Sequence, residues 1–328
     1  MQGKNPAELK IIRVLKGEGS GYVSGQSISS ALGISRTAVW KHMNSLKGAG
    51  FPIEASPSKG YRLASPKDPF NGVGIAAMLT TDIIGKEVVF FPSIDSTNVK
   101  AFELGRNGAP EGTAVVADRQ TKGKGRIGRK WESPPGVNLY ASIILRPGIM
   151  PHEAHQLTFL MAVAAVEAIS PYSPRPPKVK WPNDILIDSK KAAGILMEMD
   201  SEADRVHFVV AGIGVNLNIR EKDFPDYIKG AATSLRERCG QEIDRAAFTR
   251  GLFSSMEKWY RIYLGKGFAP VLDEWKRHFG SEGKPVRIAS FHRDVSGICM
   301  GVDNGGALLV KTSSGVERVI SGDVEAGE

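Results

Sequence analysis

The chain has 328 residues, enough for about two or three domains of ordinary size. Hydrophobic residues make up 41% of it and charged residues 24%, a composition that excludes a disordered, collagen-like or disulfide-rich chain. Cys239 and Cys299 stand alone without CxxC spacing, so no zinc site is expected. The first residues lack the apolar core of a signal peptide, and the longest apolar stretch, 157–169, is interrupted by Glu167. We therefore expect a soluble, cytoplasmic protein that does not bind membranes.

The net charge of +8 is concentrated in the first fifth of the chain. Residues 1–65 contain nine Lys and Arg against three Asp and Glu, a net charge of +6, whereas the other 263 residues carry +2. A basic segment attached to a nearly neutral body is typical of a nucleic-acid-binding domain joined to a second functional unit.

Three helices and two short strands are expected in this basic head. Apolar residues at helical spacing predict a first helix over 5–16, a second over 25–32 and a third that ends near Lys47. A Gly-containing turn between the second and third helices is the signature of a helix-turn-helix. Residues 51–54 and 60–63 are predicted to be the strands of a wing.

The third helix of the head has two distinct faces. Val39, Met43 and Leu46 form an apolar stripe that we expect to face the core. The other face and the helix start, which Ser35 is placed to cap, match a recognition helix in the major groove. The predicted DNA contacts are Ser35, Arg36, Thr37, Trp40 and Lys41, with Lys59 of the wing reaching phosphate. A protein-binding winged helix is the alternative, and Trp40 could instead pack on the neighbouring domain.

Residues 65–69 contain two prolines and no apolar period, and predict a linker. Beyond them the pattern alternates strands and helices. Strands are expected at 88–91, 113–117, 137–145, 178–181, 185–187, 193–199 and 206–215, and helices from near Thr97, over 152–169, and at about 244–264 and 269–279. Their turns indicate a mixed or largely antiparallel sheet in one α+β domain. Residues 284–320 are predicted to form β-hairpins.

Three segments of the central domain carry residues suited to chemistry. The first, QTKGKGRIGRKW (120–131), alternates glycines with cations, so that the backbone can approach a phosphate or carboxylate closely. It is neither a Walker loop nor a dinucleotide-binding turn, because GxxxxGK[ST] is absent and no helix follows. A flexible basic loop without a ligand is the alternative.

The second segment combines KVKWPND (178–184) with the KKAAG that follows. Asp184 could bind Mg²⁺, which prefers oxygen ligands and bridges phosphates. Lys180 and Lys191 could neutralise a phosphate or carboxylate. A surface hairpin with solvated lysines is the alternative, and we prefer it for Lys190.

The third segment is GIGVNLN (212–218), at the end of a strand. Glycines there permit close approach by a ligand, and the Asn216 side chain offers both donors and an acceptor. Close packing of the strand explains the same residues equally well.

Five motifs together resemble the bacterial biotin–protein ligases that are also biotin operon repressors. They are DSTN (95–98), GKGRIGRKW (123–131), KWPND (180–184), KKAAGIL (190–196) and GIGVN (212–216), in this order. The resemblance covers the whole chain. It implies a multidomain α+β protein with a winged helix-turn-helix (1–65), a mixed-sheet α/β catalytic domain of the biotin/lipoate ligase type (66–280) and an SH3-like β-barrel (281–328). The glycine loop departs from the family's GRGRRG at Lys124, which keeps the charge, and at Ile127, which removes one.

The resemblance implies two reactions. Biotin and MgATP give biotinyl-5′-AMP and pyrophosphate, and the adenylate then acylates one lysine of the biotin carboxyl carrier protein of acetyl-CoA carboxylase. Because the attacking carboxylate and the α-phosphate are both anionic, Arg126 and Lys191 would be the catalytic cations, and Asp184 would hold Mg²⁺. The implied nucleotide contacts are Arg129, Trp131, Lys180, Asn183 and Asn216. The implied biotin contacts are Ser96, Thr97, Asn98, Gln120, Gly123, Lys124, Gly125, Arg126, Lys191, Gly194 and Gly212.

The resemblance also implies regulation. The protein filled with biotinyl-AMP is expected to form a homodimer that binds operator DNA and represses biotin biosynthesis. The glycine loop is expected to close over the adenylate and exclude water. A lipoate–protein ligase and a ligand-sensing repressor without ligase activity are the alternatives, and the head could also have lost its regulatory role. The glycine loop, the head and the C-terminal β domain favour biotin, and Asp184, Lys191 and Arg126 favour an active enzyme.

Overall fold

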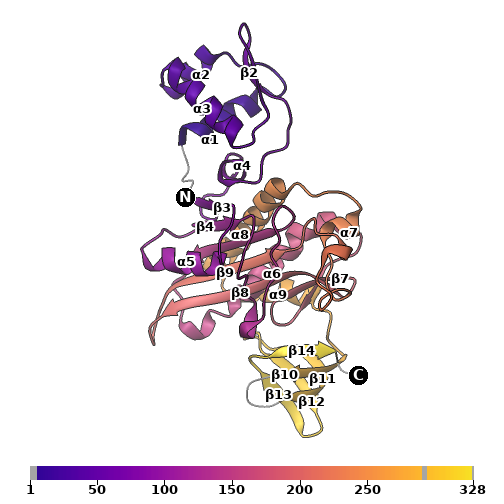
Figure 1. Cartoon of the computed structure of the whole chain (residues 1–328). Helices are drawn as coiled ribbons and strands as arrows, with labels where there is room; N and C mark the ends of the chain where they lie inside the picture. The colour runs from indigo at the N-terminus through magenta and orange to yellow at the C-terminus, as the bar shows by residue number, and fades with distance from the viewer. Residues whose placement is uncertain (1–5, 290–293, 327–328) are drawn as a thin grey trace.

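The computed structural model describes residues 6–289 and 294–326. The chain forms three parts in a row, with the basic head at one end, a central sheet with its helices, and a small β domain at the other end (Figure 1). None of the helices in the described ranges is long and apolar enough to cross a membrane.

The head has the expected winged helix-turn-helix elements. They are α1 (Pro6–Gly17), α2 (Gly25–Leu32), α3 (Arg36–Gly48) and the antiparallel pair β1 (Ile53–Ser56) and β2 (Gly60–Leu63). Asn5, where we expected the first helix to begin, lies outside the described residues. Ser35 caps α3 by accepting a hydrogen bond from the backbone N–H of Ala38, as predicted. Gly33 ends α2 with a φ of 67°, which glycine adopts without strain.

The two faces of α3 are confirmed. Its apolar stripe is buried in the head's core, at Val39, Met43 and Leu46. Residues 65–69 contain no helix or strand, as expected of a linker. They lead into α4 (Gly72–Ala76), which lies between the head and the central sheet (Figure 1). Ile75 belongs to the core of the central domain and Ala77 to that of the head, so this stretch is packed on both sides.

The central sheet is mixed, as predicted. Its seven strands follow the order β3-β4-β5-β9-β8-β7-β6. Their bounds are β3 (Val88–Phe91), β4 (Ala114–Ala117), β5 (Leu139–Leu145), β6 (Lys178–Lys180), β7 (Asp184–Ile187), β8 (Lys190–Ser201) and β9 (Val206–Val215). β3 and β4 run parallel, and all the other neighbours are antiparallel. β8 is longer at both ends than the predicted 193–199, because it pairs with β7 from Lys190 and with β9 as far as Ser201.

Helices cover both faces of this sheet. They are α5 (Thr97–Arg106), α6 (Gln156–Ile169), α7 (Leu235–Cys239), α8 (Arg245–Lys266) and α9 (Ala269–His278). Successive residues of a strand face opposite sides: Val116 of β4 joins the large core with α6 and α8, and Val115 packs with Ala101 of α5. The helix expected over 152–169 begins as a separate 3₁₀ turn, Pro151–Glu153, and continues as α6.

The C-terminal part is an antiparallel sheet of five strands in the order β13-β12-β11-β10-β14, in agreement with the expected small β domain. Its strands are β10 (Pro285–Ala289), β11 (Val295–Val302), β12 (Leu308–Thr312), β13 (Gly315–Val319) and β14 (Asp323–Ala326). The buried Trp181 donates from Nε1 to the carbonyl oxygen of Gly306 at 3.1 Å. This bond attaches the small domain to the central one.

Candidate active site and DNA-binding surface

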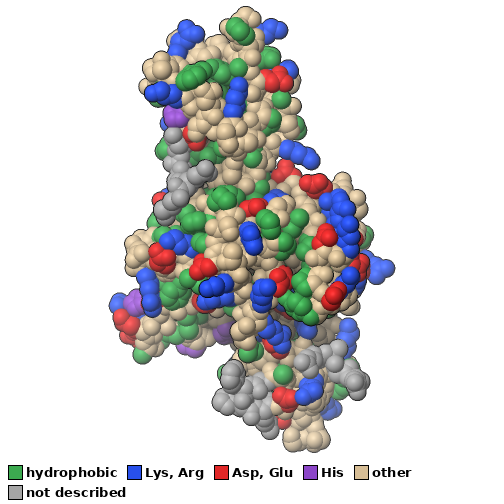
Figure 2. All heavy atoms as spheres, viewed as in Figure 1, with side chains coloured by type: hydrophobic (Ala, Val, Ile, Leu, Met, Phe, Trp, Pro, Cys, Tyr) green, Lys and Arg blue, Asp and Glu red, His purple; other side chains and the backbone are tan. Residues whose placement is uncertain are grey.

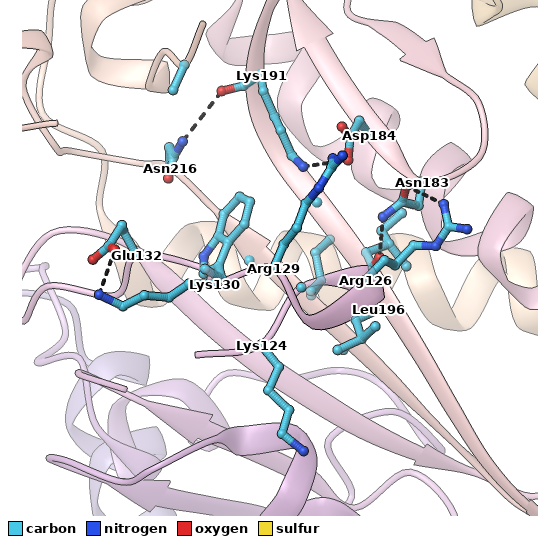
Figure 3. Close-up of a pocket in the computed structure, with 18 of the residues that line it drawn as sticks. Lys124, Arg126, Arg129, Lys130, Glu132, Asn183, Asp184, Lys191, Leu196 and Asn216 are labelled. Carbon is cyan, nitrogen blue, oxygen red and sulfur yellow. Dashed lines mark hydrogen bonds and ion pairs between the residues drawn. The ribbon is translucent and has the colours of Figure 1, made fainter. Parts of the chain in front are cut away.

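A cavity of about 490 Å³ lies between the central sheet, the glycine loop and the start of β14. Such a volume suits a small-molecule ligand. Fifteen of the predicted ligand contacts line it, namely Ser96, Thr97, Asn98, Gln120, Lys124, Gly125, Arg126, Arg129, Trp131, Asn183, Asp184, Lys191, Gly194, Gly212 and Asn216. Gly123 and Lys180 do not. Lys124 lines the cavity, but its ammonium group points away from Asp184 and Lys191 (Figure 3).

One end of the cavity is a hydrogen-bonded network at the start of α5. The Thr97 backbone N–H and hydroxyl both donate to Gln120 Oε1, at 2.8 and 3.0 Å. Gln120 Nε2 in turn donates to Ser133 Oγ at 3.0 Å. Ser96 is the N-cap of α5, yet its hydroxyl makes no capping hydrogen bond. The Ser96 hydroxyl is therefore available to a polar ligand group.

Asn98 is held by both ends of its amide. The fully buried Ser142 donates to Asn98 Oδ1 at 2.6 Å, and Asn98 Nδ2 donates to Glu198 Oε2 at 2.8 Å. A Cβ atom on Gly212 would collide with this amide. The space that Gly212 leaves open is thus filled by Asn98, and sequence reasoning had assigned that space to a ligand.

The Trp131 indole lies against the same sheet. A Cβ atom on Gly194 would lie 3.0 Å from the ring, and one on Gly214 would collide with it. Lys191 Nζ is 5.4 Å from the ring centroid, within cation–π range. Trp131 Nε1 is buried and has no hydrogen-bond partner within the described part of the chain. A ligand acceptor at this point would satisfy a donor whose burial is otherwise costly.

Lys191 and Asp184 form the charged centre of the cavity. Lys191 Nζ lies 2.7 Å from Asp184 Oδ1, across the paired strands β7 and β8 (Figure 3). The neighbouring Lys190 instead pairs with Glu221, at 2.8 Å, outside the cavity. This agrees with the surface position that we preferred for Lys190.

Asp184 also fits the predicted Mg²⁺ position. Its buried Oδ1 accepts no hydrogen bond among the described residues, apart from the ion pair with Lys191. No group of three His, Cys, Asp or Glu side chains in the described ranges could hold a metal. A single carboxylate still suits Mg²⁺, which keeps several waters and binds substrate phosphates.

The glycine loop is a compact turn around the 3₁₀ segment Arg126–Gly128. The Gly125 N–H donates to the carbonyl oxygen of Arg129 at 2.6 Å. Ile127, one of the two departures from the family pattern, has a φ of 52° and a 56%-exposed side chain outside the cavity. A β-branched residue rarely adopts this left-handed conformation. Ile127 therefore strains the loop and does not itself line the cavity.

The two arginines of the loop meet a carboxylate of the small β domain. Arg129 Nη2 lies 2.8 Å from Asp323 Oδ2, and Arg126 Nη1 lies 3.5 Å from Asp323 Oδ1. Arg126 Nη1 also donates to Asn183 Oδ1 at 3.3 Å (Figure 3). Burial lowers the pKa of the Arg126 guanidinium, and the nearby Asp323 and Asp184 oppose that shift. Arginine stays cationic at neutral pH under such a shift.

Asn216 and Asn183 line the cavity and also hydrogen-bond to the backbone around it. Asn216 Nδ2 donates to the carbonyl oxygens of Thr233 and Lys191, at 3.1 and 3.5 Å. Asn183 Nδ2 donates to the carbonyl oxygen of Ile195 at 2.7 Å. Both amides therefore hold the backbone of β8, the strand that carries Lys191 and Gly194.

Sequence reasoning missed one wall of the cavity and several charged groups. The wall is formed by Ile219, Phe224, Tyr227, Ile228, Ala231 and Ala232. The other missed residues are Lys130, Glu132, Ile195, Leu196, Ile213, Gly214 and Asp323. Most of the wall comes from irregular chain that carries no periodic pattern. The sequence contains no signal that places Asp323 beside the glycine loop.

The predicted DNA contacts form an exposed surface on the head. Ser35, Arg36, Thr37, Trp40, Lys41 and Lys59 are all exposed. Trp40 is 56% exposed, so it is not buried against the neighbouring domain. Lys and Arg side chains lie around the head in Figure 2. All six side chains are therefore accessible to a binding partner.

Comparison with known proteins agrees with the three parts of the fold. The sequence matches the biotin/lipoate A/B protein ligase family over residues 90–216, the HTH domain over 8–62 and the biotin protein ligase C-terminal domain over 283–327. It is 42% identical over 317 residues to the bifunctional ligase/repressor BirA of Bacillus subtilis (strain 168), covering 97% of this chain and 98% of that protein. The chain belongs to the BirA family of bifunctional ligase/repressors.

Other members and relatives of this family align over most of the chain. BirA of Escherichia coli (strain K12) is 31% identical over 322 residues, which is 98% of this chain and 97% of that protein. The structure of the Aquifex aeolicus biotin protein ligase in complex with biotin and ATP is 29% identical, with a TM-score of 0.62. It covers 73% of this chain and 97% of that one.

Proposed function

We propose that the protein activates biotin with MgATP to biotinyl-5′-AMP and transfers the biotin to a lysine of a biotin carboxyl carrier protein, such as that of acetyl-CoA carboxylase. The main support for this proposal is that Arg126, Lys191 and Asp184 line one cavity, whose size suits a small-molecule ligand. The names of the relatives and the biotin and ATP bound to the Aquifex aeolicus ligase support biotin over lipoate.

In the first step a biotin carboxylate oxygen attacks the α-phosphorus of ATP, and the bond to pyrophosphate breaks. Both reactants are anionic, so cations in the cavity must offset their repulsion. Lys191 and Arg126 take that role in our proposal. Asp184 would hold Mg²⁺, which neutralises the triphosphate when bound. Any phosphate at Lys191 also competes with Asp184 for the ammonium group, which lies 2.7 Å from that carboxylate.

In the second step the carrier lysine attacks the acyl carbon of the adenylate, the bond to the phosphate oxygen breaks, and AMP leaves. A mixed anhydride hydrolyses readily, so water must be kept away until the carrier arrives. We assign this cover to the glycine loop, where Gly125 and Arg126 line the cavity.

The remaining site residues divide into two groups in this proposal. Ser96, Thr97, Asn98, Gln120 and Gly194 serve the biotin end, and Gly212 serves it by leaving room for Asn98. Arg129, Trp131, Asn183 and Asn216 serve the nucleotide. Gly123 and Lys180 lie off the cavity, so we assign them supporting roles. Lys180 faces Asp184 across the β6–β7 pair, and a Cβ atom on Gly123 would collide with the carbonyl oxygen of Trp131.

A transfer assay tests the ligase proposal. The protein is incubated with biotin, ATP, Mg²⁺ and a biotin carboxyl carrier domain, and the intact mass of the carrier is measured. We expect the mass of one biotin to be added to the carrier, with release of AMP. A carrier whose target lysine is replaced by arginine is the matched control and should stay unmodified. A carrier of unchanged mass would contradict the proposal.

We infer further that the head binds operator DNA and that biotinyl-AMP promotes the homodimer that binds it. In this proposal the head is residues 1–65, the catalytic domain is residues 66–280 and the small β domain is residues 281–328. The protein would be a cytoplasmic repressor of biotin biosynthesis. Ordering of loops by the ligand would lower the entropic cost of pairing two protomers. Sedimentation with and without biotin plus ATP tests the pairing, and identical masses in both would contradict it.

Gel-shift titration tests the DNA surface. The probe is a duplex selected by the intact protein from a random pool in the presence of biotin and ATP. The variant Arg36→Ala/Lys41→Ala should bind this duplex at least about tenfold more weakly, because both cations face the groove and its phosphates. Lys10→Ala, which removes an exposed cation from α1, is the control. Equal affinities of the two variants would contradict the assignment.

A further inference from the structure

The segment that joins the head to the central sheet, residues 65–77, contains a buried carboxylate. The Asp68 side chain is 2% exposed, and its Oδ2 atom lies 2.7 Å from Lys16 Nζ and 3.1 Å from Arg250 Nη1. Lys16 belongs to α1 of the head, and Arg250 belongs to α8 of the central domain. One oxygen atom thus joins a cation from each domain.

Further hydrogen bonds join this segment to both domains. Arg250 Nη1 donates to the carbonyl oxygen of Gly74 at 2.6 Å, and Arg13 Nε of α1 donates to that of Ala77 at 2.7 Å. Asn71 Nδ2 donates to the carbonyl oxygen of Ala49, the C-cap of α3, at 2.7 Å. The end of the helix with the predicted DNA contacts is therefore fastened directly to the segment that contains α4.

A second arginine of α8 holds the segment beside Asp68. The guanidinium carbon of Arg245 lies 3.7 Å from the ring centroid of Phe70, in a cation–π contact. Arg245 is itself fixed, because it donates to Asp118 Oδ1 at 2.7 Å and to the carbonyl oxygen of Asn138 at 3.0 Å. Helix α8 thus contacts the segment at two points, through Arg245 at Phe70 and through Arg250 at Asp68.

A buried charge that loses its partner is strongly destabilising, so paired buried charges restrict a protein to arrangements that keep the pairs intact. A free tether would leave Asp68 in water and allow the head many orientations. We propose that Asp68 is a positioning residue, which fixes the orientation of the head on the catalytic domain. The consequence for DNA rests on the proposed repressor function, because the two recognition helices of a dimer must reach half-sites one helical turn, about 34–36 Å, or a multiple of it apart. The orientation itself does not depend on that function.

Spin-label distance measurements test the proposal without DNA. Labels are attached at Ser20→Cys on the head and Lys266→Cys at the end of α8, both exposed positions, in a Cys239→Ser background. We expect one narrow distance distribution for the parent protein and loss of that single peak in Asp68→Asn. Asp82→Asn is the matched control, because Asp82 also pairs with an α8 arginine, Arg261, but is 83% exposed. It should keep the parent distribution.

Two further measurements separate a moved head from an unfolded protein. Biotinyl-AMP formation and the far-UV circular dichroism of Asp68→Asn should equal those of the parent. Lys16→Gln, which removes the head's cation from the same carboxylate, should broaden the distribution in the same way. A distribution as narrow in Asp68→Asn and Lys16→Gln as in the parent would overturn the proposal.

Affinity for the selected duplex gives the functional consequence. If the binding-competent orientation falls to about a tenth of the population, the apparent Kd rises about tenfold. We expect that loss for Asp68→Asn and none for Asp82→Asn. If the parent protein binds no duplex, the repressor proposal fails, and the distance measurement still decides the role of Asp68.

Discussion

Asp323 of the small β domain lies 2.8 Å from Arg129 of the glycine loop. The same carboxylate reaches Arg126 at 3.5 Å, and the carbonyl oxygen of Gly322 accepts a hydrogen bond from that arginine at 3.3 Å. The loop is therefore held from outside the catalytic domain. A phosphate entering the cavity competes with Asp323 for the same guanidinium groups, so the small domain is part of the site.

Removing this carboxylate should loosen the loop. A partly exposed ion pair contributes about 1 kcal/mol, which corresponds to about a fivefold change in the opening of the loop. We expect trypsin to cleave Asp323→Ala within residues 122–130 about fivefold faster than the parent, and biotin with ATP to suppress the cleavage. Fragment masses over time give the rate. Asp294→Ala, which removes an exposed carboxylate from the same domain, is the control. Equal cleavage in Asp323→Ala and the parent would contradict this role.

Replacing Lys191 by alanine should act mainly on the first reaction. The ammonium group is the cation paired with Asp184 inside the cavity, and loss of one such electrostatic stabiliser costs about 10²–10³ in rate. Formation of biotinyl-AMP is measured by quenched flow, and transfer is measured separately from supplied biotinyl-AMP. Lys190→Ala is the matched control, since Lys190 pairs with Glu221 outside the cavity. A defect in Lys191→Ala confined to transfer would show that the role is assigned to the wrong step.

Arg126→Gly should still make enough adenylate, because Lys191 stays in the cavity, but should fail to retain it. Arg126 joins the loop to Asn183 and to the small β domain, so its loss opens the cover over the cavity. We expect released biotinyl-AMP to label bystander proteins, detected by streptavidin blotting of serum albumin added to the reaction. Lys122→Gly, an exposed change in the same loop, should not label them. Retention of the adenylate with unchanged selectivity in Arg126→Gly would count against the cover.

Gly212→Ala should weaken biotin binding at least about fivefold. The added methyl group meets the Asn98 amide, which the buried Ser142 holds at 2.6 Å, and overpacking of this kind costs about 1–3 kcal/mol. Isothermal titration gives the Kd. Gly251→Ala, where nothing lies within 4 Å of the new Cβ atom, is the control. If Gly212→Ala bound biotin with the parent's Kd, the position of the Asn98 amide would not matter for biotin binding, and the prediction would be wrong.

Patterns in the sequence predicted the parts of the fold that repeat along the chain. The stripe of Val39, Met43 and Leu46 predicted the buried face of α3, and apolar runs predicted the strands of the central sheet. β8 extends beyond the predicted 193–199 because pairing with its neighbours carries it into the polar residues Lys190 and Ser201. Local patterns cannot show such pairing.

The polar half of the site was predictable, and the rest was not. Gly-rich and charged motifs predicted Arg126, Asp184 and Lys191, because phosphate and metal binding needs glycines and charged residues that lie close together in the sequence. The wall around Phe224, by contrast, is ordinary apolar chain that becomes part of a cavity only in three dimensions. Asp68 shows the same limit, because prolines predicted a linker while its partner Arg250 lies in a distant helix.

The synthesis of biotinyl-AMP in the cavity can be tested in one experiment. The protein is incubated with equal concentrations of biotin and lipoate, with ATP and Mg²⁺, and the small molecules that stay bound are identified by mass spectrometry. We predict bound biotinyl-AMP and no lipoyl-AMP. Lipoyl-AMP as the main product would make the protein a lipoate ligase, and no adenylate of either acid would contradict the enzymatic role of Lys191 and Arg126.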